Sequence, residues 1–522
     1  MRKHPPKLPI LLLALVVVLG LAGCVELSTP TDTATTPEPQ ETTVAEPVEP
    51  AETQAEETEA TDVTDTTDVA DATDATDAAE EEESLSTPAV ADDKETQTVE
   101  TASLADTFGI PGDTYKLEQV VVLSRHNIRS PLSGSGSNLA KITTHEWFPW
   151  TSAPSELSLR GGVLETMNGQ FFRQWLEAEE LIPANWQPRQ REVRFFANSL
   201  QRTIATSQYF SSGMLPVANV PIEIDGTYGK GGGIFLPLVT WTSDAYVQAA
   251  LEELSHRNGA TDMTEVNASM REPFELVQDV LDYEDSTGYL SGEFGDLVTT
   301  DTQVTLEVGA EPTMTGSLKL ATSAADALVL QSYEESDLTA ASFGHDLSFA
   351  QWQEVGSILG AYNDTLFCSP LIASQVAHPL LAEIGQELDT PGRIFSFLCG
   401  HDSNIGSVCA ALEVAPYELE GAIEPTTPIG SKLVFERYTD STGAEYGRVR
   451  LVYQSVDQLR SCSMLTPENL PMSEELELEG LQKNADGLYD YDDLRARVQE
   501  AADAFDEIKA RYGEEPELQD AA

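Results

Sequence analysis

The stretch QVVVLSRHNIRSPL (residues 119–132) decides the fold, because a strand and a cluster of charged side chains meet within it. Its first five residues form a short, β-branched apolar run, which is typical of a buried strand in a parallel sheet. A second such run, IFSFLC (residues 394–399), stops at GHDSNI (residues 400–405), and a helical pattern follows over residues 406–412. Ligands of open α/β sheets bind beyond the carboxyl ends of the strands, so we expect an α/β fold with both run ends at one site.

A third segment follows the same plan. VRFFA (residues 193–197) predicts a strand, and Asn198 or Ser199 can cap a helix predicted over residues 200–210. Arg202 then lies in the first turn of that helix. Helix N-termini and guanidinium groups both bind phosphate dianions, because both present N–H donors and positive charge. This segment therefore adds an arginine to the predicted site.

These residue types together predict phosphoryl transfer. Arg125, Arg129 and Arg202 can neutralise a phosphate and the equatorial oxygens of its transition state. A neutral His126 can attack phosphorus in line and form a phosphohistidine. Asp402 can protonate the leaving alkoxide and then activate water for the second step. This chemistry needs no metal or cofactor, and the sequence presents no metal-ligand cluster.

The two histidine motifs differ in how specific they are. Arg-His-x-x-Arg-x-Pro arises by chance about once in a thousand chains of this length, judged from average residue usage. The flanking arginines disfavour the alternative that His126 is a buried structural histidine. Gly-His-Asp alone is weak, because the chain contains it twice. The copy at residues 344–346 follows no strand-like run, so we expect a surface turn or a helix cap there.

Several segments resemble the histidine acid phosphatases, and within them the bacterial glucose-1-phosphatase branch. The resemblance covers about residues 115–501 and is weakest between about residues 228 and 315. One departure from the wider family is Asn127, where most members have glycine, but this branch also has asparagine. The similar segments are SRHNIRSPL (124–132), LRGGVLE (159–165), ANSLQRT (197–203), GHDSNI (400–405), TPIG (427–430), VYQS (452–455) and QLR (458–460).

The resemblance implies a role for each residue of the site. His126 would be the phosphorylated nucleophile and Asp402 the proton donor. The phosphate would be bound by Arg125, Arg129, Arg202 and His401.

The resemblance also implies a phosphoglycerate-mutase-like fold in two parts. Residues 113–216 and 392–505 would form an α/β catalytic domain around the sheet. Residues 217–391 would form a second, mostly helical domain. Helical periodicity over residues 245–254 and 349–359 agrees with the second part.

The N-terminus predicts export and a lipid anchor. Three basic residues precede an apolar run over residues 10–21, which is too short to span a bilayer and is typical of a signal peptide. The run ends in LAGC (residues 21–24), which resembles a bacterial lipobox, so Cys24 would be lipidated. A plain signal peptide with a chance cysteine is the alternative. With the anchor, residues 1–24 place the mature chain at the cell surface or in the periplasm, attached to a membrane.

An acidic segment follows Cys24. Residues 26–100 contain 24 acidic residues, one basic residue and no aromatic residue. Such a composition buries too little apolar surface to offset its ordering entropy, so residues 25–112 are expected to form a disordered linker. Residues 506–522 are predicted to form an acidic tail.

Charge limits the partners of the remaining chain. Residues 101–522 carry 25 Lys and Arg against 64 Asp and Glu, which argues against nucleic-acid binding. The expected ligand is a small phosphate monoester held by a local basic cluster. Four cysteines besides Cys24 could form disulfides in an exported protein or remain thiols, and no zinc-site spacing is present. They are Cys368, Cys399, Cys409 and Cys462.

Three alternatives to a sugar phosphatase stay open. A phytase shares the predicted fold and residues, but the acidic composition favours sugar monophosphates over a polyanion. A silent surface lipoprotein could bind phosphorylated ligands without hydrolysis, yet pure binding needs no acid such as Asp402. A mutase of the related phosphoglycerate mutase superfamily is disfavoured in an exported chain. The oligomeric state does not follow from the sequence.

Overall fold

The computed structural model describes residues 103–133, 137–256, 260, 262–299 and 302–513. The predicted signal peptide, Cys24 and the linker up to residue 102 lie outside these residues. So do residues 514–522 of the predicted acidic tail.

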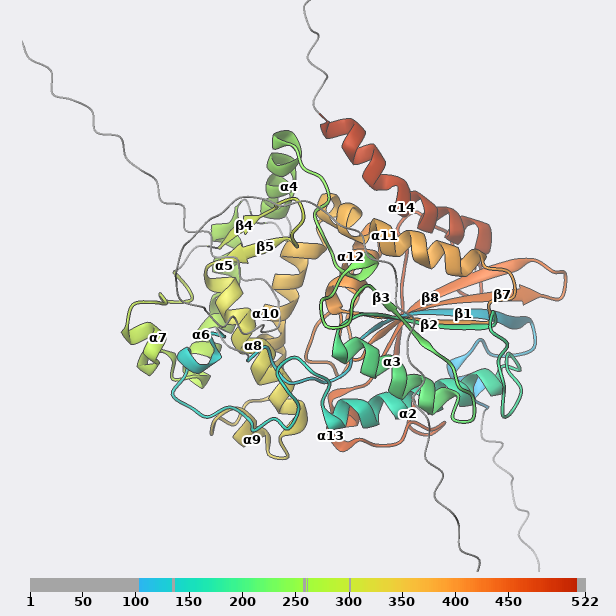
Figure 1. Cartoon of the computed structure of the whole chain (residues 1–522), viewed down its shortest axis with the longest axis horizontal. Helices are drawn as coiled ribbons and strands as arrows, with labels where there is room; N and C mark the ends of the chain where they lie inside the picture. Colours follow the sequence, from blue (N-terminus) through green and yellow to red (C-terminus); the bar gives the residue numbers. More distant parts are fainter. Residues whose placement is uncertain (1–102, 134–136, 257–259, 261, 300–301, 514–522) are drawn as a thin grey trace, which may run out of the picture. The chain divides into compact units, whose positions relative to one another are not determined.

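A mixed sheet of eight strands organises the chain (Figure 1). Its order is β10-β8-β7-β1-β6-β2-β3, and β9 pairs with the free edge of β8. The strands β1, β6, β2 and β3 are parallel, as the buried apolar runs predict, whereas β7, β8, β9 and β10 extend the sheet in antiparallel pairs. The strands are β1 (Tyr115–Arg125), β2 (Val193–Asn198), β3 (Ile222–Asp225), β6 (Phe395–Gly400), β7 (Lys432–Asp440), β8 (Glu445–Tyr453), β9 (Met472–Glu475) and β10 (Tyr489–Asp490).

Helices cover both faces of this sheet (Figure 1). One face packs against α2 and α3 through an apolar cluster that includes Phe172, Phe210 and Phe397. The other face packs against α11, α12 and α14 through a second cluster that includes Leu381, Ile405 and Leu494. These helices are α2 (Leu159–Ala178), α3 (Gln201–Met214), α11 (Pro370–Asp389), α12 (Asp402–Ala411) and α14 (Tyr491–Tyr512); the short α13 (Val456–Ser461) follows β8.

A close crossing fixes α2 against α3. A Cβ atom on Gly169 would lie 2.1 Å from the carbonyl oxygen of Phe210, and one on Gly213 would lie 2.1 Å from that of Thr166. Only glycine permits this approach of the two backbones. The helix α3 begins three residues after the end of β2, so Arg202 in its first turn lies near the carboxyl end of that strand.

A third apolar cluster forms the core of a mostly helical part, beside the sheet in Figure 1. Among the described helices, none is long and apolar enough on its own to cross a bilayer, and α10 with α11 passes that test only as a pair bent by 82°. The elements of this part are α4 (Asp244–His256), α5 (Met263–Ser269), α6 (Arg271–Val280), α7 (Thr287–Leu290), β4 (Gln303–Thr305), β5 (Thr313–Thr315), α8 (Ser317–Glu334), α9 (Leu338–Ala341) and α10 (Phe349–Phe367).

The structure corrects the predicted boundaries of the linker and the tail. Residues 103–112 were assigned to the linker, but α1 (Leu104–Phe108) folds onto α2 and buries Leu104 and Phe108. The guanidinium of Arg450 stacks on the Phe108 ring at 4.0 Å. Leu104 and Phe108 are four positions apart and so lie on one face of this turn, although the average composition around them is polar. The predicted tail is helical as far as Tyr512, because α14 continues to that residue.

The helical part is also smaller than the predicted range 217–391. The first residues of the predicted range include β3, which extends the main sheet beside β2. The last residues of that range include α11, which covers a face of the sheet. Apolar helices that pack on a sheet or on other helices have the same periodicity, so the sequence does not separate the two cases.

Two helices begin at different residues from those predicted. The helix α12 starts at Asp402 rather than at residue 406, so His401 is its N-cap residue. The helix α3 starts at Gln201, and its N-cap residue is Leu200 rather than Asn198 or Ser199. Asp402 is therefore the first residue of α12, and Arg202 is the second residue of α3.

Candidate active site

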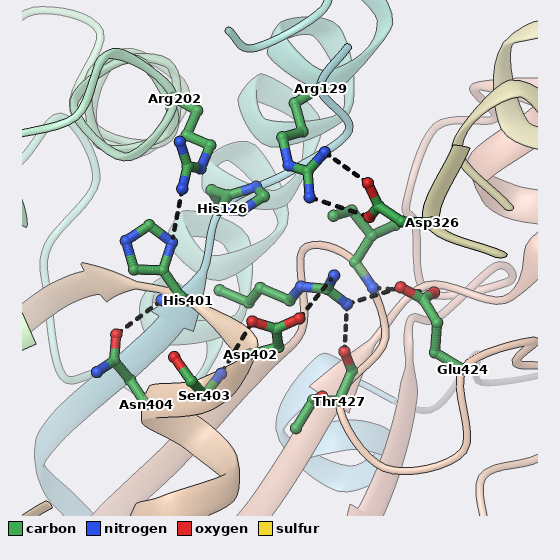
Figure 2. A network of polar contacts seen from close by, with 12 residues as sticks. His126, Arg129, Arg202, Asp326, His401, Asp402, Ser403, Asn404, Glu424 and Thr427 are labelled. Carbon is green, nitrogen blue, oxygen red and sulfur yellow. Dashed lines mark hydrogen bonds and ion pairs between the residues drawn. The ribbon is translucent and has the colours of Figure 1, made fainter. Parts of the chain in front are cut away.

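The pairing of β1 with β6 brings the two histidine motifs together. Their parallel register places Arg125 opposite Gly400, and the His126 amide donates to the Gly400 carbonyl over 3.0 Å. A histidine directly follows each strand, and the ring centroids of His126 and His401 lie 5.5 Å apart. Figure 2 shows both rings between Arg202 and Asp402.

His126 is held as a neutral imidazole with one nitrogen available. Its Nδ1 lies 2.9 Å from the carbonyl oxygen of Asn127, which can only accept, so Nδ1 carries the proton. The Nε2 atom therefore keeps its lone pair. The side chain is 3% exposed, and this burial, together with the charges of Arg202 and Arg129, holds the pKa of His126 well below its usual range. A neutral, buried imidazole can act as a nucleophile at acidic and neutral pH.

Three guanidinium groups surround this imidazole and keep unused donors. Within the described part of the chain, the buried Nε atoms of Arg125, Arg129 and Arg202 have no hydrogen-bond partner. Burial, followed by the charge of Arg129, lowers the pKa of Arg202 to about 9, which leaves it charged at neutral and acidic pH. Clustered buried cations with unsatisfied donors are costly unless an anion joins them. The arrangement therefore fits an anionic group bound among the three arginines.

Arg125 separates two carboxylates of different surroundings. Its Nη2 lies 3.2 Å from Asp402, whose side chain is 46% exposed. Its Nη1 lies 2.6 Å from Glu424 and 2.5 Å from the Thr427 carbonyl, and the Glu424 side chain is only 5% exposed. Glu424 also accepts from the Tyr333 hydroxyl at 2.8 Å. Asp402 is thus the carboxylate of this pair that substrate and water can reach.

Asp402 and His401 are positioned by the start of α12. The Ser403 amide donates to Asp402 at 2.9 Å, and the Asn404 side chain accepts from the His401 amide at 2.9 Å. Partial burial would raise the pKa of Asp402, but the charge of Arg125 and the hydrogen bond from the Ser403 amide outweigh it, so the pKa is lowered. Burial and Arg202 lower the pKa of His401 well below its usual range. The Nδ1 atom of that neutral ring lies 3.5 Å from an Nη atom of Arg202.

The six residues predicted for the site lie together in one cluster, drawn in large part in Figure 2. The second Gly-His-Asp copy lies elsewhere, on a turn after α9 where His345 is 3.7 Å from Asp279. This agrees with the turn expected there. The described residues contain no disulfide, so all four cysteines after Cys24 keep their thiols.

Sequence reasoning missed Asp326. This residue of α8 holds Arg129 with two contacts of 3.0 Å, as Figure 2 shows. The available signal was one carboxylate in the otherwise apolar stretch AADALVL (residues 324–330). Glu424 is the other carboxylate beside Arg125, and its burial argues against a role as proton donor.

Comparison with known proteins agrees with this geometry. Residues 116–454 match the histidine phosphatase superfamily (branch 2).

The chain belongs to that family.

Within the histidine phosphatases, the chain is similar to glucose-1-phosphatases. It is 35% identical over 385 residues to the glucose-1-phosphatase of Providencia rettgeri, which covers 73% of this chain and 90% of the relative. It is 34% identical to the glucose-1-phosphatase of Salmonella typhimurium strain LT2, over 72% of this chain and 89% of the relative. The apo phytase of Hafnia alvei superposes with a TM-score of 0.69 at 25% identity, covering 75% of this chain and 98% of that structure.

These similarities confirm the resemblance found in the sequence. The chain is a histidine-type phosphatase that hydrolyses phosphate monoesters. Its α/β fold with a mixed sheet matches that of solved phytases.

Proposed function

We propose that this phosphatase hydrolyses sugar phosphates such as glucose 1-phosphate through a phosphohistidine on His126. One observation carries the proposal: a neutral His126, with Nδ1 committed to the Asn127 carbonyl, lies among three arginines whose Nε donors are unused. The phosphate group would bind to Arg125, Arg129, Arg202 and His401.

The first step transfers the phosphoryl group to the enzyme. The lone pair of His126 Nε2 forms a bond to phosphorus as the bond from phosphorus to the ester oxygen breaks. Asp402, whose side chain is 46% exposed, gives its proton to that leaving oxygen, and the sugar departs as an alcohol. The arginines stabilise the charge on the equatorial oxygens.

The second step returns the enzyme to its starting state. Asp402, now a carboxylate, takes a proton from water as the water oxygen attacks phosphorus. The bond from phosphorus to Nε2 breaks, and inorganic phosphate leaves. The hydrogen bond from Nδ1 to Asn127 persists throughout and stabilises the positive ring of the phosphohistidine.

Acidic residues beside the arginines support a substrate with one phosphate. Asp326 already neutralises Arg129, and Glu311 interacts electrostatically with both Arg202 and Asp402. A polyphosphorylated substrate would bring further negative charge close to these carboxylates, which costs binding energy. The higher identity to glucose-1-phosphatases than to the Hafnia phytase points the same way.

A phytase activity is the second candidate, because the fold superposes on a phytase over most of that structure. A catalytically silent binding lipoprotein is disfavoured, since binding alone would not use a solvent-accessible acid such as Asp402. We also propose that residues 1–24 export the chain and that a lipid on Cys24 anchors it to a membrane at the cell surface or in the periplasm. The acidic segment behind Cys24 would act as a spacer.

A substrate comparison tests the proposal. The purified full chain is assayed with glucose 1-phosphate, phytate and p-nitrophenyl phosphate between about pH 4 and pH 7. We expect kcat/KM for glucose 1-phosphate to exceed that for phytate by about tenfold or more. A higher value for phytate would replace the sugar phosphatase assignment with a phytase. Loss of all three activities in a folded protein would support the silent lipoprotein.

A further inference from the structure

Beneath His126 lies a buried ion pair that none of the steps above uses. Glu165 on α2 and Lys432 at the start of β7 approach within 2.9 Å, and their side chains are 0% and 1% exposed. Burying an ion pair costs more than an apolar contact of the same size, so stability alone does not account for it. Its neighbours connect it to the nucleophile.

The Asn127 side chain joins this ion pair to the histidine loop. Its Nδ2 donates to Glu165 over 2.8 Å, while its Oδ1 accepts from the Ile128 amide at 2.8 Å. The Asn127 amide donates to the Thr206 hydroxyl at 3.1 Å. Both ends of the side chain and the backbone N–H are thus fixed, and the remaining backbone group is the carbonyl that accepts from His126 Nδ1.

The contacts continue from the ion pair and return to His126. Lys432 Nζ donates to the Gly430 carbonyl over 2.8 Å, and the Gly430 amide donates to the His126 carbonyl over 3.1 Å. Gly430 has φ +71°, and a Cβ atom there would lie 2.6 Å from Asn127 Nδ2. A side chain at position 430 would therefore displace the Asn127 amide. His126, Asn127, Glu165, Lys432 and Gly430 form a closed circuit, which we call the Asn127 circuit.

We propose that Asn127, Glu165 and Lys432 are positioning residues that orient the Asn127 carbonyl and so fix His126 in the tautomer with Nε2 directed at phosphorus. This inference rests on the proposed function of His126. The lysine keeps the pair neutral, so Glu165 holds Asn127 without cancelling the arginine charges that the phosphate needs. A misplacement of the reacting nitrogen by about 1 Å costs about 10²-fold in rate.

Asn127→Ala tests this role by removing the link while leaving the carbonyl in place. With p-nitrophenyl phosphate we expect the pre-steady-state phosphorylation rate to fall about 10- to 100-fold. KM and the inhibition constant for inorganic phosphate should stay within about threefold. Asn168→Ala is the matched control, because Asn168 is a buried residue of the same helix as Glu165 and bonds to Gln454 at 3.0 Å. The control should lose stability without this loss of rate.

A mutant cycle separates positioning from a general loss of structure. The double variant Glu165→Gln/Lys432→Met removes both charges and weakens the hold on Asn127. Combined with Asn127→Ala, it should slow phosphorylation by clearly less than the product of the two separate losses, because Glu165 acts through Asn127 while Lys432 also holds the Gly430 carbonyl. Multiplied losses in the triple variant, or an Asn127→Ala rate within twofold of the parent, would overturn the proposal.

Nitrogen-15 NMR of the histidine-labelled full chain gives a readout that does not depend on turnover. We expect a single Nδ1-protonated signal for His126 in the parent and a mixture of tautomers in Asn127→Ala. An identical His126 signal in both proteins would overturn the circuit's role even if the parent hydrolyses no monoester. A parent protein that hydrolyses no monoester would contradict the proposed function, whereas an unchanged NMR signal would contradict only the role of the Asn127 circuit. The two failures are therefore distinguishable.

Discussion

The carboxylate of Asp402 lies 3.2 Å from Nη2 of Arg125, and this contact lowers the pKa of the proposed proton donor. An acid with a lowered pKa is protonated only in acidic solution. The ratio of kcat/KM for glucose 1-phosphate to that for p-nitrophenyl phosphate should therefore fall as pH rises from about 4 to 7, because the sugar alkoxide needs the proton. Steady-state assays of both substrates across this range measure the ratio. A ratio that does not change with pH would contradict a proton-donating role for Asp402.

Asp402→Asn removes the proton and keeps the shape of the side chain. It should slow phosphorylation by glucose 1-phosphate by about 10² to 10⁴. The first step with p-nitrophenyl phosphate should suffer much less, because its leaving group has a pKa near ~7, below that of an ordinary phenol at about 10. Burst kinetics separate this step from dephosphorylation. Equal losses with both substrates would mean that Asp402 positions the phosphate or His401 instead.

The sequence predicted those parts of the fold that local patterns encode. The apolar runs over residues 119–123 and 394–399 predicted two buried strands, and the parallel register of these strands explains why His126 and His401 meet. The motif residues at the strand ends and at the start of α3 form one cluster, as expected. A strand followed by charged residues carries this information locally.

Features that depend on partners far along the chain were not predictable in this way. Asp326 reaches Arg129 from a helix almost 200 residues away, and the lone carboxylate in its apolar stretch does not indicate which residue it contacts. The antiparallel strands β7 and β8 that extend the sheet carry the buried Glu436, Arg448 and Arg450, which read as surface charges in the sequence. Arg448 and Arg450 also donate to the carbonyl of Phe108. Because the sequence near Phe108 does not reveal these distant donors, the composition alone predicted a linker where α1 folds.

The lowered pKa of His126 also affects stability. Below about pH 6.5 the unfolded chain binds a proton on this residue that the folded chain does not. The free energy of unfolding should therefore fall as pH decreases below about 6.5, by up to about 1.4 kcal/mol per pH unit for this histidine. Urea unfolding of the parent and of His126→Asn measures the difference, and the variant should show a smaller slope. Equal slopes would mean that His126 is protonated in the folded state.

Asp326→Asn should shift the enzyme towards polyanionic substrates. It removes one negative charge beside Arg129 and keeps the size of the side chain. We expect the ratio of kcat/KM for phytate to that for glucose 1-phosphate to rise about 3- to 10-fold at low ionic strength, and less at high salt. Asp282→Asn is a matched control, because Asp282 is an exposed partner of His145. A change of similar size in the control would attribute the effect to net charge.

The proposed anchor and spacer are tested by two changes. Cys24→Ser should move the enzyme from the membrane fraction to the soluble fraction after cell breakage. Deleting residues 30–100 from that soluble variant should leave kcat and KM within about twofold, because this acidic stretch is not expected to pack on the enzyme. A Cys24→Ser protein that stays on membranes, or a large loss of activity on deletion, would contradict the assignment.

The most direct test asks which atom carries the phosphoryl group. Rapid quench into alkali of the enzyme mixed with 32P-labelled p-nitrophenyl phosphate should trap an acid-labile phosphoenzyme, because the proposed bond is between nitrogen and phosphorus. Peptide mapping should place the label on His126, and His126→Ala should abolish both label and turnover. Label on any other residue, or undiminished turnover in His126→Ala, would contradict the proposed mechanism.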